Sequence, residues 1–588
     1  MLFFYFGCTS SDTRNVENRR PNIILIFTDD QGYGDVAIHN NQDINTPELD
    51  ALARKSVRLD NFRSQAVCSP SRATLLTGRN FLKTGVWGTG GGRQYLNLDE
   101  TTIADILQSA GYYTSMLGKW HLGKVGPYLP PARGFDNTWR LYDNHDHLDP
   151  VLDHNGTTLR VQGWTADYLT DRVIELLKGK KQPQFIYLAY PLIHEPYEAP
   201  DSLVQGYLAK GFSASLSTLY AMTEHVDYNV GRVMQTLDKT GLKENTIVLF
   251  IGDNGRIGNP VNMPHLTEAE LDRRNPQGFR GLKGHLFEGG LRVPAFVSWP
   301  DKFPPRIVSE HTDLTDILPT LLDISGITLP AENKPVDGLS LLPLLNSTAD
   351  TLPARYLYYG NHEAVWKGRT ELFSFLKDRG HLEFELIDLA ILHGDYKYVS
   401  MWGRLQNGSL QALYNLADEP SEETSLNDSQ PEIRARLQQQ LETWWHRDVI
   451  ERSDSYNLPT FFVGFPGEDT NYAFAQAPSA IYGNVQTKNS HTVNWRSNGD
   501  GQDIPLQVVE SGYYKISADV EVAHAAGYLE IVIGKQRLIA PIKDGNVLQL
   551  GVLDLLPGPA DLQIRLTDVP TVDQLILAKL TAIKFQRQ

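Results

Sequence analysis

An apolar run near the start of the chain restricts the available folds more than any other feature. The segment PNIILIFTDDQGYGD, residues 21–35, passes from Ile, Leu and Phe directly into acidic and glycine-rich turn residues. A strand buried on both faces of a parallel sheet has this pattern, because neither face needs polar side chains. Similar runs recur at 185–190, 246–255 and 293–299. Helical patterns separate them, at 46–56, 101–111, 164–179 and 215–241, and this alternation predicts an α/β fold with a mainly parallel sheet sandwiched by helices.

The pattern changes beyond residue 350, where further domains are expected. Short antiparallel strands and a helix at 431–448 predict a smaller α+β subdomain over 351–455, packed against the 21–350 α/β domain. A loop-rich linker is expected at 456–480. Residues 481–588 alternate apolar and polar residues between turns, which is typical of an antiparallel β-sandwich.

Charge and hydropathy exclude two classes of function. The net charge of −16 argues against nucleic-acid binding, since DNA affinity depends on Lys and Arg that neutralise phosphates. The same charge allows an anionic small substrate, because a local basic pocket can lie within an acidic protein. No segment approaches the about 20 consecutive apolar residues that a membrane-spanning helix needs.

The chain has two cysteines, Cys8 and Cys68. Cys8 ends the short apolar run MLFFYFGC ahead of a polar stretch, which resembles the tail of a bacterial lipoprotein signal. Residues 1–20 are therefore expected to be a signal remnant and a disordered tail, with a lipid on Cys8 as the link to a membrane. We expect an exported protein, in the periplasm or at the bacterial cell surface, in which Cys68 is the free thiol.

Acidic residues follow two of the apolar strands. Asp29 and Asp30 end the first apolar run, and Asp253 and Asn254 lie at the carboxyl end of the run at 246–255. Ligands of parallel sheets bind beyond the carboxyl ends of the strands. Carboxylate and amide oxygens suit Ca²⁺ or Mg²⁺, so these residues predict a metal site.

Lysines and histidines could form a cationic pocket beside such a metal. Lys119 and His121 in GKWHLGK lie two residues apart and would face the same side of an extended strand. His194 follows the strand at 185–190, and Lys283 lies in a glycine-flanked loop. Together these groups would bind a tetrahedral anion.

Cys68 precedes a helix-compatible segment, CSPSRATLLTGR. This places its thiol at a helix N-terminus, where backbone N–H groups favour negative charge. A thiolate nucleophile, a metal ligand and an inert packing residue remain open on this reasoning alone.

The same segment is similar to the signature of the type I sulfatases, in its Cys form; these enzymes belong to the alkaline phosphatase superfamily. Further motifs follow over about residues 20–450 in the order typical of that family: the Asp-Asp pair, GKWHLG, a His after a Pro, Asp-Asn-Gly and GLKG…EGGLRVP. The late segment LYNLADEPSEETSL also resembles one of the family. The resemblance implies an alkaline-phosphatase-like fold for the α/β domain.

The resemblance implies that a formylglycine-generating enzyme oxidises Cys68 to Cα-formylglycine (3-oxoalanine), whose aldehyde hydrates to a gem-diol. One hydroxyl would attack sulfur and expel the alcohol, and the second would eliminate sulfate from the sulfoenzyme intermediate. Arg72 and Lys119 would hold the diol, and His121 would act as the base in the elimination.

The resemblance also implies one Ca²⁺, and groups that contact the sulfate. The metal ligands would be Asp29, Asp30, Asp253, Asn254 and the modified Cys68. His194 and Lys283 would bind sulfate oxygens and protonate the leaving oxygen, where negative charge develops.

The loops that would contact the rest of the substrate match no such pattern. The segment RLYDNHDHLDPVLDHNG, 140–156, is rich in groups that could bind sugar hydroxyls or a carboxylate, although a solvated polar loop is an equal alternative. The candidate substrate-binding residues are Arg93, His145, His147 and Arg280, followed by Asp143, Asp146, His154, Arg256 and His265.

These observations predict a sulfuric ester hydrolase that acts on a sulfated carbohydrate, such as the algal polysaccharide ulvan or its oligosaccharides. Glycosaminoglycans are the next expected substrates. Two alternatives remain: a phosphonate or phosphodiester hydrolase of the same superfamily, and a non-catalytic glycan-binding surface protein.

Overall fold

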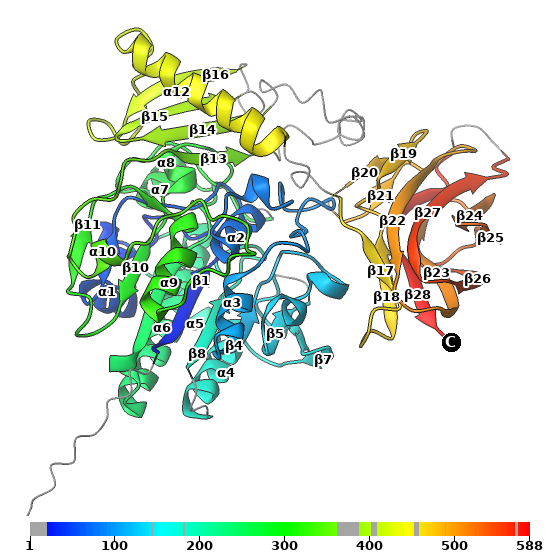
Figure 1. Ribbon diagram of the computed structural model, residues 1–588, viewed down its shortest axis with the longest axis horizontal. Coiled ribbons are helices and arrows are strands. Elements are labelled where there is room, and N and C mark those ends of the chain that lie inside the picture. The colour runs from blue at the N-terminus through cyan, green and yellow to red at the C-terminus, as the bar shows by residue number, and fades with distance from the viewer. Residues whose placement is uncertain are drawn as a thin grey trace, which may run out of the picture.

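The computed structural model describes residues 20–588 except 143–144, 180–182, 261, 362–386, 402–408, 452–457, 489 and 571–573 (Figure 1). The expected signal remnant and Cys8 lie outside the described residues. Among the helices that the structure describes, none is long and apolar enough to cross a membrane.

A ten-stranded mixed sheet forms the centre of the α/β domain. Its inner strands β9, β1, β8, β4 and β5 are parallel to one another, whereas the pairings made by β10 and β6 are antiparallel. The prediction of a mainly parallel sheet is confirmed. In spatial order the strands are β11 (Arg306–Val308), β2 (Val57–Leu59), β10 (Ala295–Ser298), β9 (Thr246–Gly252), β1 (Asn22–Thr28), β8 (Gln184–Ala189), β4 (Tyr113–Gly118), β5 (Asn137–Leu141), β6 (Val151–His154) and β7 (Thr157–Arg160).

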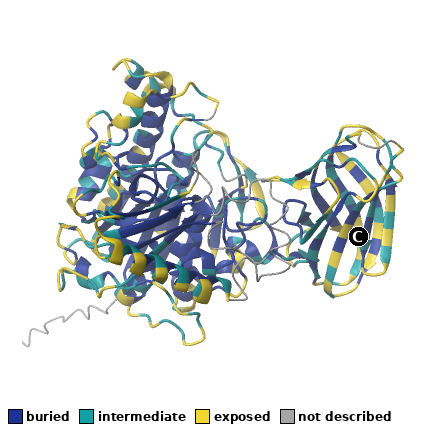
Figure 2. Cartoon of the chain, turned by 90° about the horizontal axis from the view of Figure 1, so that it is seen from above, coloured by how far each residue is buried: buried dark blue, intermediate teal, exposed yellow. Residues whose placement is uncertain are grey.

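Helices cover both faces of this sheet, which explains the unbroken apolar run of β1. Leu25 and Phe27 pack with α2 (Cys68–Thr77), α3 (Ile103–Ser109) and α9 (Ile317–Ser325). Ile24 and Ile26 point to the other face, toward α1 (Pro47–Arg54), α4 (Thr165–Gly179) and α6 (Ala214–Thr240). Figure 2 shows the buried strands between helices whose outer faces are exposed. Smaller elements are α5 (Asp201–Leu208), α7 (Glu268–Arg273), α8 (Glu288–Leu291), α10 (Leu342–Leu345) and the pair β3 (Phe62–Arg63) and β12 (Thr312–Asp313).

The expected α+β subdomain is a four-stranded antiparallel sheet with one long helix. The strands are β13 (Leu357–Asn361), β14 (Asp388–His393), β15 (Tyr396–Met401) and β16 (Leu410–Asn415). Helix α12 (Pro431–Trp444) packs on β14 and β15 and continues as a wider turn over Trp445–Ile450.

The C-terminal part is a β-sandwich of two antiparallel-rich sheets with a shared core. One sheet holds β17, β22, β27, β24, β25 and β19, and the other holds β20, β21, β28, β23, β26 and β18. The strands are β17 (Phe461–Val463), β18 (Thr470–Phe474), β19 (Ala480–Tyr482), β20 (Gln486–Thr487), β21 (Thr492–Val493), β22 (Gly501–Val508), β23 (Gly512–Val522), β24 (Tyr528–Ile533), β25 (Gln536–Pro541), β26 (Val547–Leu555), β27 (Gly558–Thr567) and β28 (Leu577–Arg587).

The prediction of a loop-rich linker at 456–480 is wrong. Within it, β17 pairs with β22 and β18 pairs with β28, so this stretch belongs to both sheets of the sandwich. The physical reason is burial: Phe461, Val463 and Ala473 lie in the core of the sandwich.

Candidate active site

The polar residues at the ends of β1 and β9 lie side by side. The parallel register pairs Thr28 with Gly252, so the residues that follow them meet at one edge of the sheet. The backbone N–H of Asp30 donates to Asp253 Oδ1 at 3.0 Å, and Asn254 Nδ2 donates to Asp30 Oδ1 at 2.8 Å. Asp30 has a φ of 63°, in the left-handed region that a non-glycine residue rarely adopts.

The donor set fits a divalent cation. Asp29 Oδ1 and Asn254 Oδ1 are buried and have no hydrogen-bond partner among the described residues. A buried oxygen of this kind calls for a ligand or ion. Ligand atoms of Asp29, Asp253 and Cys68 all lie within 4.8 Å of one another, and carboxylate and amide oxygens are the ligands that Ca²⁺ and Mg²⁺ prefer.

Cys68 is the first residue of α2, as the sequence predicts. Its side chain is buried, and burial raises the pKa of the thiol to about 11, against the opposing effect of Lys119 and Lys283. The unmodified side chain is therefore a neutral thiol at physiological pH. That state is a poor nucleophile.

Each of the three carboxylates of the site has a close cationic partner. Lys119 Nζ lies 2.5 Å from Asp29 Oδ2, Arg72 Nη2 lies 2.8 Å from Asp253 Oδ2, and Lys283 Nζ lies 2.5 Å from Asp30 Oδ1. The formal charges of these six groups cancel. A bound divalent cation would give the cluster a net charge of about +2, which suits an anionic ester.

The carboxylates differ in their pKa values. Burial alone would raise the pKa of Asp29, but Lys119 and the neighbouring cations hold it well below its usual value. Burial and then the charge of Asp29 raise the pKa of Asp253 to about 8. Mutual repulsion of this kind is relieved when a cation binds between the two groups.

The prediction that Lys119 and His121 lie on an extended strand is also wrong. Strand β4 ends at Gly118, whose φ is 105° and whose added Cβ would lie 2.0 Å from the carbonyl oxygen of Ala189. The regular strand therefore ends before Lys119, although the Lys119 N–H still donates to the carbonyl oxygen of Ala189 at 2.9 Å. Lys119 faces Asp29, whereas His121 Nε2 lies 2.9 Å from the carbonyl oxygen of Thr89.

His145 and His194 form a stacked pair beside Lys119. Their rings lie 3.9 Å apart with an interplanar angle of 8°, and His194 Nε2 is 3.9 Å from Asp30 Oδ2. Lys119 Nζ lies 3.0 Å from His145 Nε2. An ammonium group only donates, so Nε2 of His145 accepts and Nδ1 carries the ring proton. Burial and then Lys119 lower the pKa of His145, which keeps the ring neutral.

His147 contacts the backbone of this pair and does not stack with the two rings. Its Nε2 donates to the backbone oxygen of His194 at 2.7 Å. Of the candidate substrate-binding residues, the structure thus brings His145 into the cluster and places His147 behind it.

The described contacts of the other candidates lie elsewhere. Arg280 donates to Tyr414 and to the backbone of Glu422 in the α+β subdomain. Arg93 donates to Gly90 within its own loop, and His154 ends β6 and stacks on Trp139. The positions of the rest are these: Asp146 contacts Thr165 through its backbone, Arg256 is buried, His265 is exposed, and Asp143 is outside the described residues.

Sequence reasoning missed two contacts of the site, those of Tyr187 and Thr89. Tyr187, inside β8, accepts a hydrogen bond from Arg72 Nη1 at 3.4 Å. Thr89 contributes a backbone carbonyl, which any residue possesses. A tyrosine in a buried strand could have been noted as a polar group near the strand ends, but only tertiary structure reveals Thr89.

Comparison with known proteins identifies the family. The family model described as Sulfatase matches residues 21–327, more than half of the chain. The chain belongs to the sulfatase family. It is thus an enzyme that hydrolyses sulfate esters, and the sulfatase resemblance found in its sequence is confirmed.

Several relatives agree with this assignment. Arylsulfatase A of Homo sapiens is 33% identical over 390 residues, which cover 60% of this chain and 72% of the relative. Arylsulfatase G of Rattus norvegicus is 29% identical and covers 71% of this chain and 85% of its own. The crystal structure of Ps i-CgsB in complex with k-i-k-neocarrahexaose has a TM-score of 0.63 at 25% identity, over 75% of this chain and 96% of that one.

Proposed function

We propose that this sulfatase removes sulfate from a sulfated carbohydrate, with Cys68 converted to formylglycine as its nucleophile and Ca²⁺ as its metal. One observation carries the proposal. A buried cysteine, whose thiol pKa is raised by burial, begins a helix beside the carboxylates of Asp29 and Asp253 and the cations Lys119 and Lys283. A neutral thiol is not suited to attack, whereas its aldehyde derivative can supply two hydroxyls on one carbon.

The metal would be held by the oxygen atoms at the ends of β1 and β9. Asp29 Oδ1 and Asn254 Oδ1 are buried oxygens with no hydrogen-bond partner among the described residues, so they could bind the ion. When bound, Ca²⁺ would supply positive charge that lowers the pKa of the nucleophilic hydroxyl. The proposed ligands are Asp29, Asp30, Asp253, Asn254 and residue 68.

The remaining polar groups have separable tasks in this proposal. Arg72 is buried and paired with Asp253, so it orients that carboxylate and the first turn of α2. Lys283 lies beside Asp30 Oδ1 and His194 beside Asp30 Oδ2, and both would bind sulfate oxygens. The neutral ring of His145 would donate from Nδ1 to the same anion.

Burial of Cys68 also bears on its modification. The side chain is 2% exposed. A formylglycine-generating enzyme could reach it only before the chain folds. The proposed partnership with that enzyme therefore belongs to synthesis and export, not to the mature protein.

A carbohydrate substrate is supported by a relative and by the sandwich. Ps i-CgsB, which has this fold at 25% identity, binds a neocarrahexaose. The C-terminal sheets expose Tyr482, Tyr513 and Tyr528, whose rings could contact sugars. Sulfated algal polysaccharides such as ulvan and their oligosaccharides are the proposed substrates.

The test is desulfation of a panel of defined sulfated oligosaccharides, measured as free sulfate. Mass spectrometry of the Cys68 peptide should accompany it and detect loss of the thiol. Release of sulfate from at least one sugar supports the proposal. Faster cleavage of an aryl phosphodiester than of any sulfate ester would instead favour the phosphodiesterase alternative, and glycan binding without turnover would favour a non-catalytic protein.

Removal of calcium is expected to lower the thermal stability of the protein. Ca²⁺ at 100 times its Kd should stabilise the folded state by about 2.7 kcal/mol, observed as a higher Tm than in a chelator. Asp253→Asn should abolish the Ca²⁺-dependent shift, whereas Asp544→Asn, in an exposed turn of the sandwich, should retain it. An equal Ca²⁺ shift in both variants would contradict the proposed metal site.

His145→Phe is expected to lower kcat/KM for an aryl sulfate by about 10- to 100-fold, the range for one lost hydrogen bond to a charged group. Phenylalanine preserves the stacking on His194 but has no N–H group. His154→Phe is the matched control, since His154 stacks on Trp139 outside the site. If both variants keep the wild-type kcat/KM, His145 does not bind the sulfate.

A further inference from the structure

Two loops run from the candidate active site into the core of the C-terminal sandwich. One follows β4 and carries Lys119 and His121 at its start and Val125 and Tyr128 farther along. The other spans 86–96 and contains the glycine-rich segment 88–92. Val125, Tyr128 and Tyr95 pack in the same apolar cluster as the sandwich strands. The sandwich therefore shares its core with loops of the catalytic domain.

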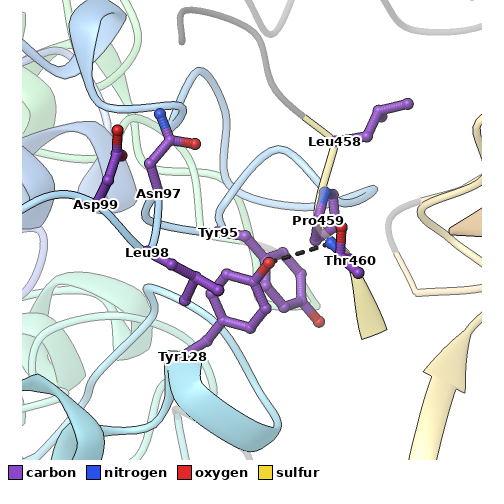
Figure 3. A pocket seen from close by; sticks show the side chains of 8 residues that line it. All are labelled: Tyr95, Asn97, Leu98, Asp99, Tyr128, Leu458, Pro459 and Thr460. Carbon is purple, nitrogen blue, oxygen red and sulfur yellow. Dashed lines mark hydrogen bonds between the residues drawn. The ribbon is translucent and has the colours of Figure 1, made fainter. Parts of the chain in front are cut away.

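Aromatic contacts and hydrogen bonds connect the two loops to the sandwich. The ring of Tyr95 lies edge-on to Tyr128 at 4.9 Å and to Phe461 of β17 at 5.8 Å. The backbone N–H of Thr460 donates to Tyr128 Oη at 3.1 Å, as Figure 3 shows. Glu468 Oε1 accepts the N–H of Gly126 at 2.8 Å.

The glycine-rich loop touches the sandwich at a specific point. A Cβ added to Gly92 would lie 2.5 Å from the Cβ of Ala477. The two backbones are thus in direct contact, which only glycine permits at this position. Gly91 has a similar positive φ, 65° against 83°, but an added Cβ there would meet nothing nearer than 3.6 Å.

The same two loops fix the ring of His121. The carbonyl oxygen of Thr89 can only accept, so the contact at 2.9 Å places the ring proton on Nε2. Nδ1 is buried and has no hydrogen-bond partner among the described residues. Ser69 Oγ donates to the backbone oxygen of His121 at 2.8 Å, which holds the residue beside Cys68 at the start of α2. This tautomer leaves Nδ1 as the proton acceptor.

We propose that the C-terminal β-sandwich positions His121 for catalysis, with Ala477 as the positioning residue. Ala477 packs against Gly92 and so fixes the position of the glycine-rich loop. This loop contains Thr89, whose carbonyl oxygen accepts the N–H of His121 and thereby selects the tautomer of the ring. The sandwich is on this view part of the active site, in addition to exposing tyrosines that could contact sugars. The inference rests on the proposed function only in assigning a proton transfer to His121.

The test uses paired glycine variants of the full-length enzyme. Gly92→Ala should lower kcat for an aryl sulfate by about 10- to 100-fold, since small misplacements of a catalytic group have such effects, with KM little changed. Gly91→Ala introduces the same backbone strain without the clash and should lower kcat much less. The double variant Gly92→Ala/Ala477→Gly removes the colliding methyl group and should recover a large part of the loss.

The tautomer of His121 supplies a readout that does not depend on turnover. In protein with ¹³C-labelled histidine, the imidazole carbon shifts distinguish a proton on Nε2 from one on Nδ1, and His121→Gln assigns the signal. Gly92→Ala should alter the His121 signal, and the double variant should restore it. Val552→Ala, an exposed position of the sandwich on β26, should leave both the signal and kcat unchanged.

Failure of this inference differs from failure of the proposed function. A wild-type protein without desulfation would refute the proposed function, while the His121 signal would still report on the sandwich. An unchanged kcat and an unchanged signal in Gly92→Ala would overturn the positioning role. So would a loss of kcat that Ala477→Gly fails to recover while the signal stays constant.

Discussion

Cys68→Ala is expected to reduce hydrolysis of an aryl sulfate by about 10⁴- to 10⁶-fold, the loss typical when a nucleophile is removed. The physical reason is the position of residue 68 among the groups that would bind the metal and the anion. Alanine removes one buried atom and adds no bulk, so the fold should persist. The measurement is kcat/KM, together with the Tm.

Two further variants make this result specific. Cys8→Ala removes the other cysteine of the chain and should leave the rate of the purified protein unchanged. Cys68→Ser supplies one hydroxyl but no second one on the same carbon, so it could accept sulfate without releasing it. Peptide mass spectrometry should then find sulfate on the first turn of α2. Full turnover in Cys68→Ala would refute residue 68 as the nucleophile.

The strand ends could be predicted from the sequence because their signal is local. An apolar run followed by Asp29 and Asp30 identifies a buried strand and the pocket beyond it, and the same holds for Asp253. Cys68 was placed at a helix start for a similar reason, since its neighbours supply the helical pattern. Such residues are positioned by the elements they belong to.

The rest depends on contacts between distant segments. Strand β17 has three residues and finds its partner β22 more than 40 positions later, so its short apolar pattern reads as a loop. Lys119 and His121 do not lie on an extended strand because β4 ends at Gly118, which approaches the backbone of Ala189 more closely than a residue with a Cβ could. His145 contacts Lys119 in the site, whereas Arg280 contacts Tyr414 in the α+β subdomain. Nothing near either residue in the sequence predicts this difference.

A buried cluster of charges joins the α+β subdomain to the catalytic domain. The carboxylate of Glu288 in α8 lies 2.7 Å from Arg63 Nη2, 2.8 Å from Arg292 Nε and 3.0 Å from Lys397 Nζ of β15. Lys397 also lies 2.9 Å from Glu422 Oε1. Lys397 and both carboxylates are fully buried, so each charge depends on its partners rather than on water.

Lys397→Met is expected to lower the free energy of unfolding by about 3–5 kcal/mol, because it removes the cation that pairs with the buried carboxylate of Glu422. Methionine keeps most of the side-chain volume, so the effect reports on charge. Lys579→Met is the matched control: its ion pair with Glu521 is about half exposed on the sandwich, and its loss should change stability by about 0–1 kcal/mol. Urea denaturation measures both variants, and equal stabilities would contradict the role of the cluster.

The pH dependence of unfolding separates lost charge from lost packing. Burial alone would raise the pKa of Glu288, but Arg63, Lys397 and Arg292 hold it well below the usual 4.5. The unfolded chain therefore takes up this proton at a higher pH than the folded protein does. The stability that Glu288 contributes is fully present above pH 4.5 and is lost as the pH falls through its folded pKa. Without Lys397 the pKa of Glu288 rises, so Lys397→Met should lose stability to acid at a higher pH than wild type, whereas a defect of packing alone would lower the whole curve by a constant amount.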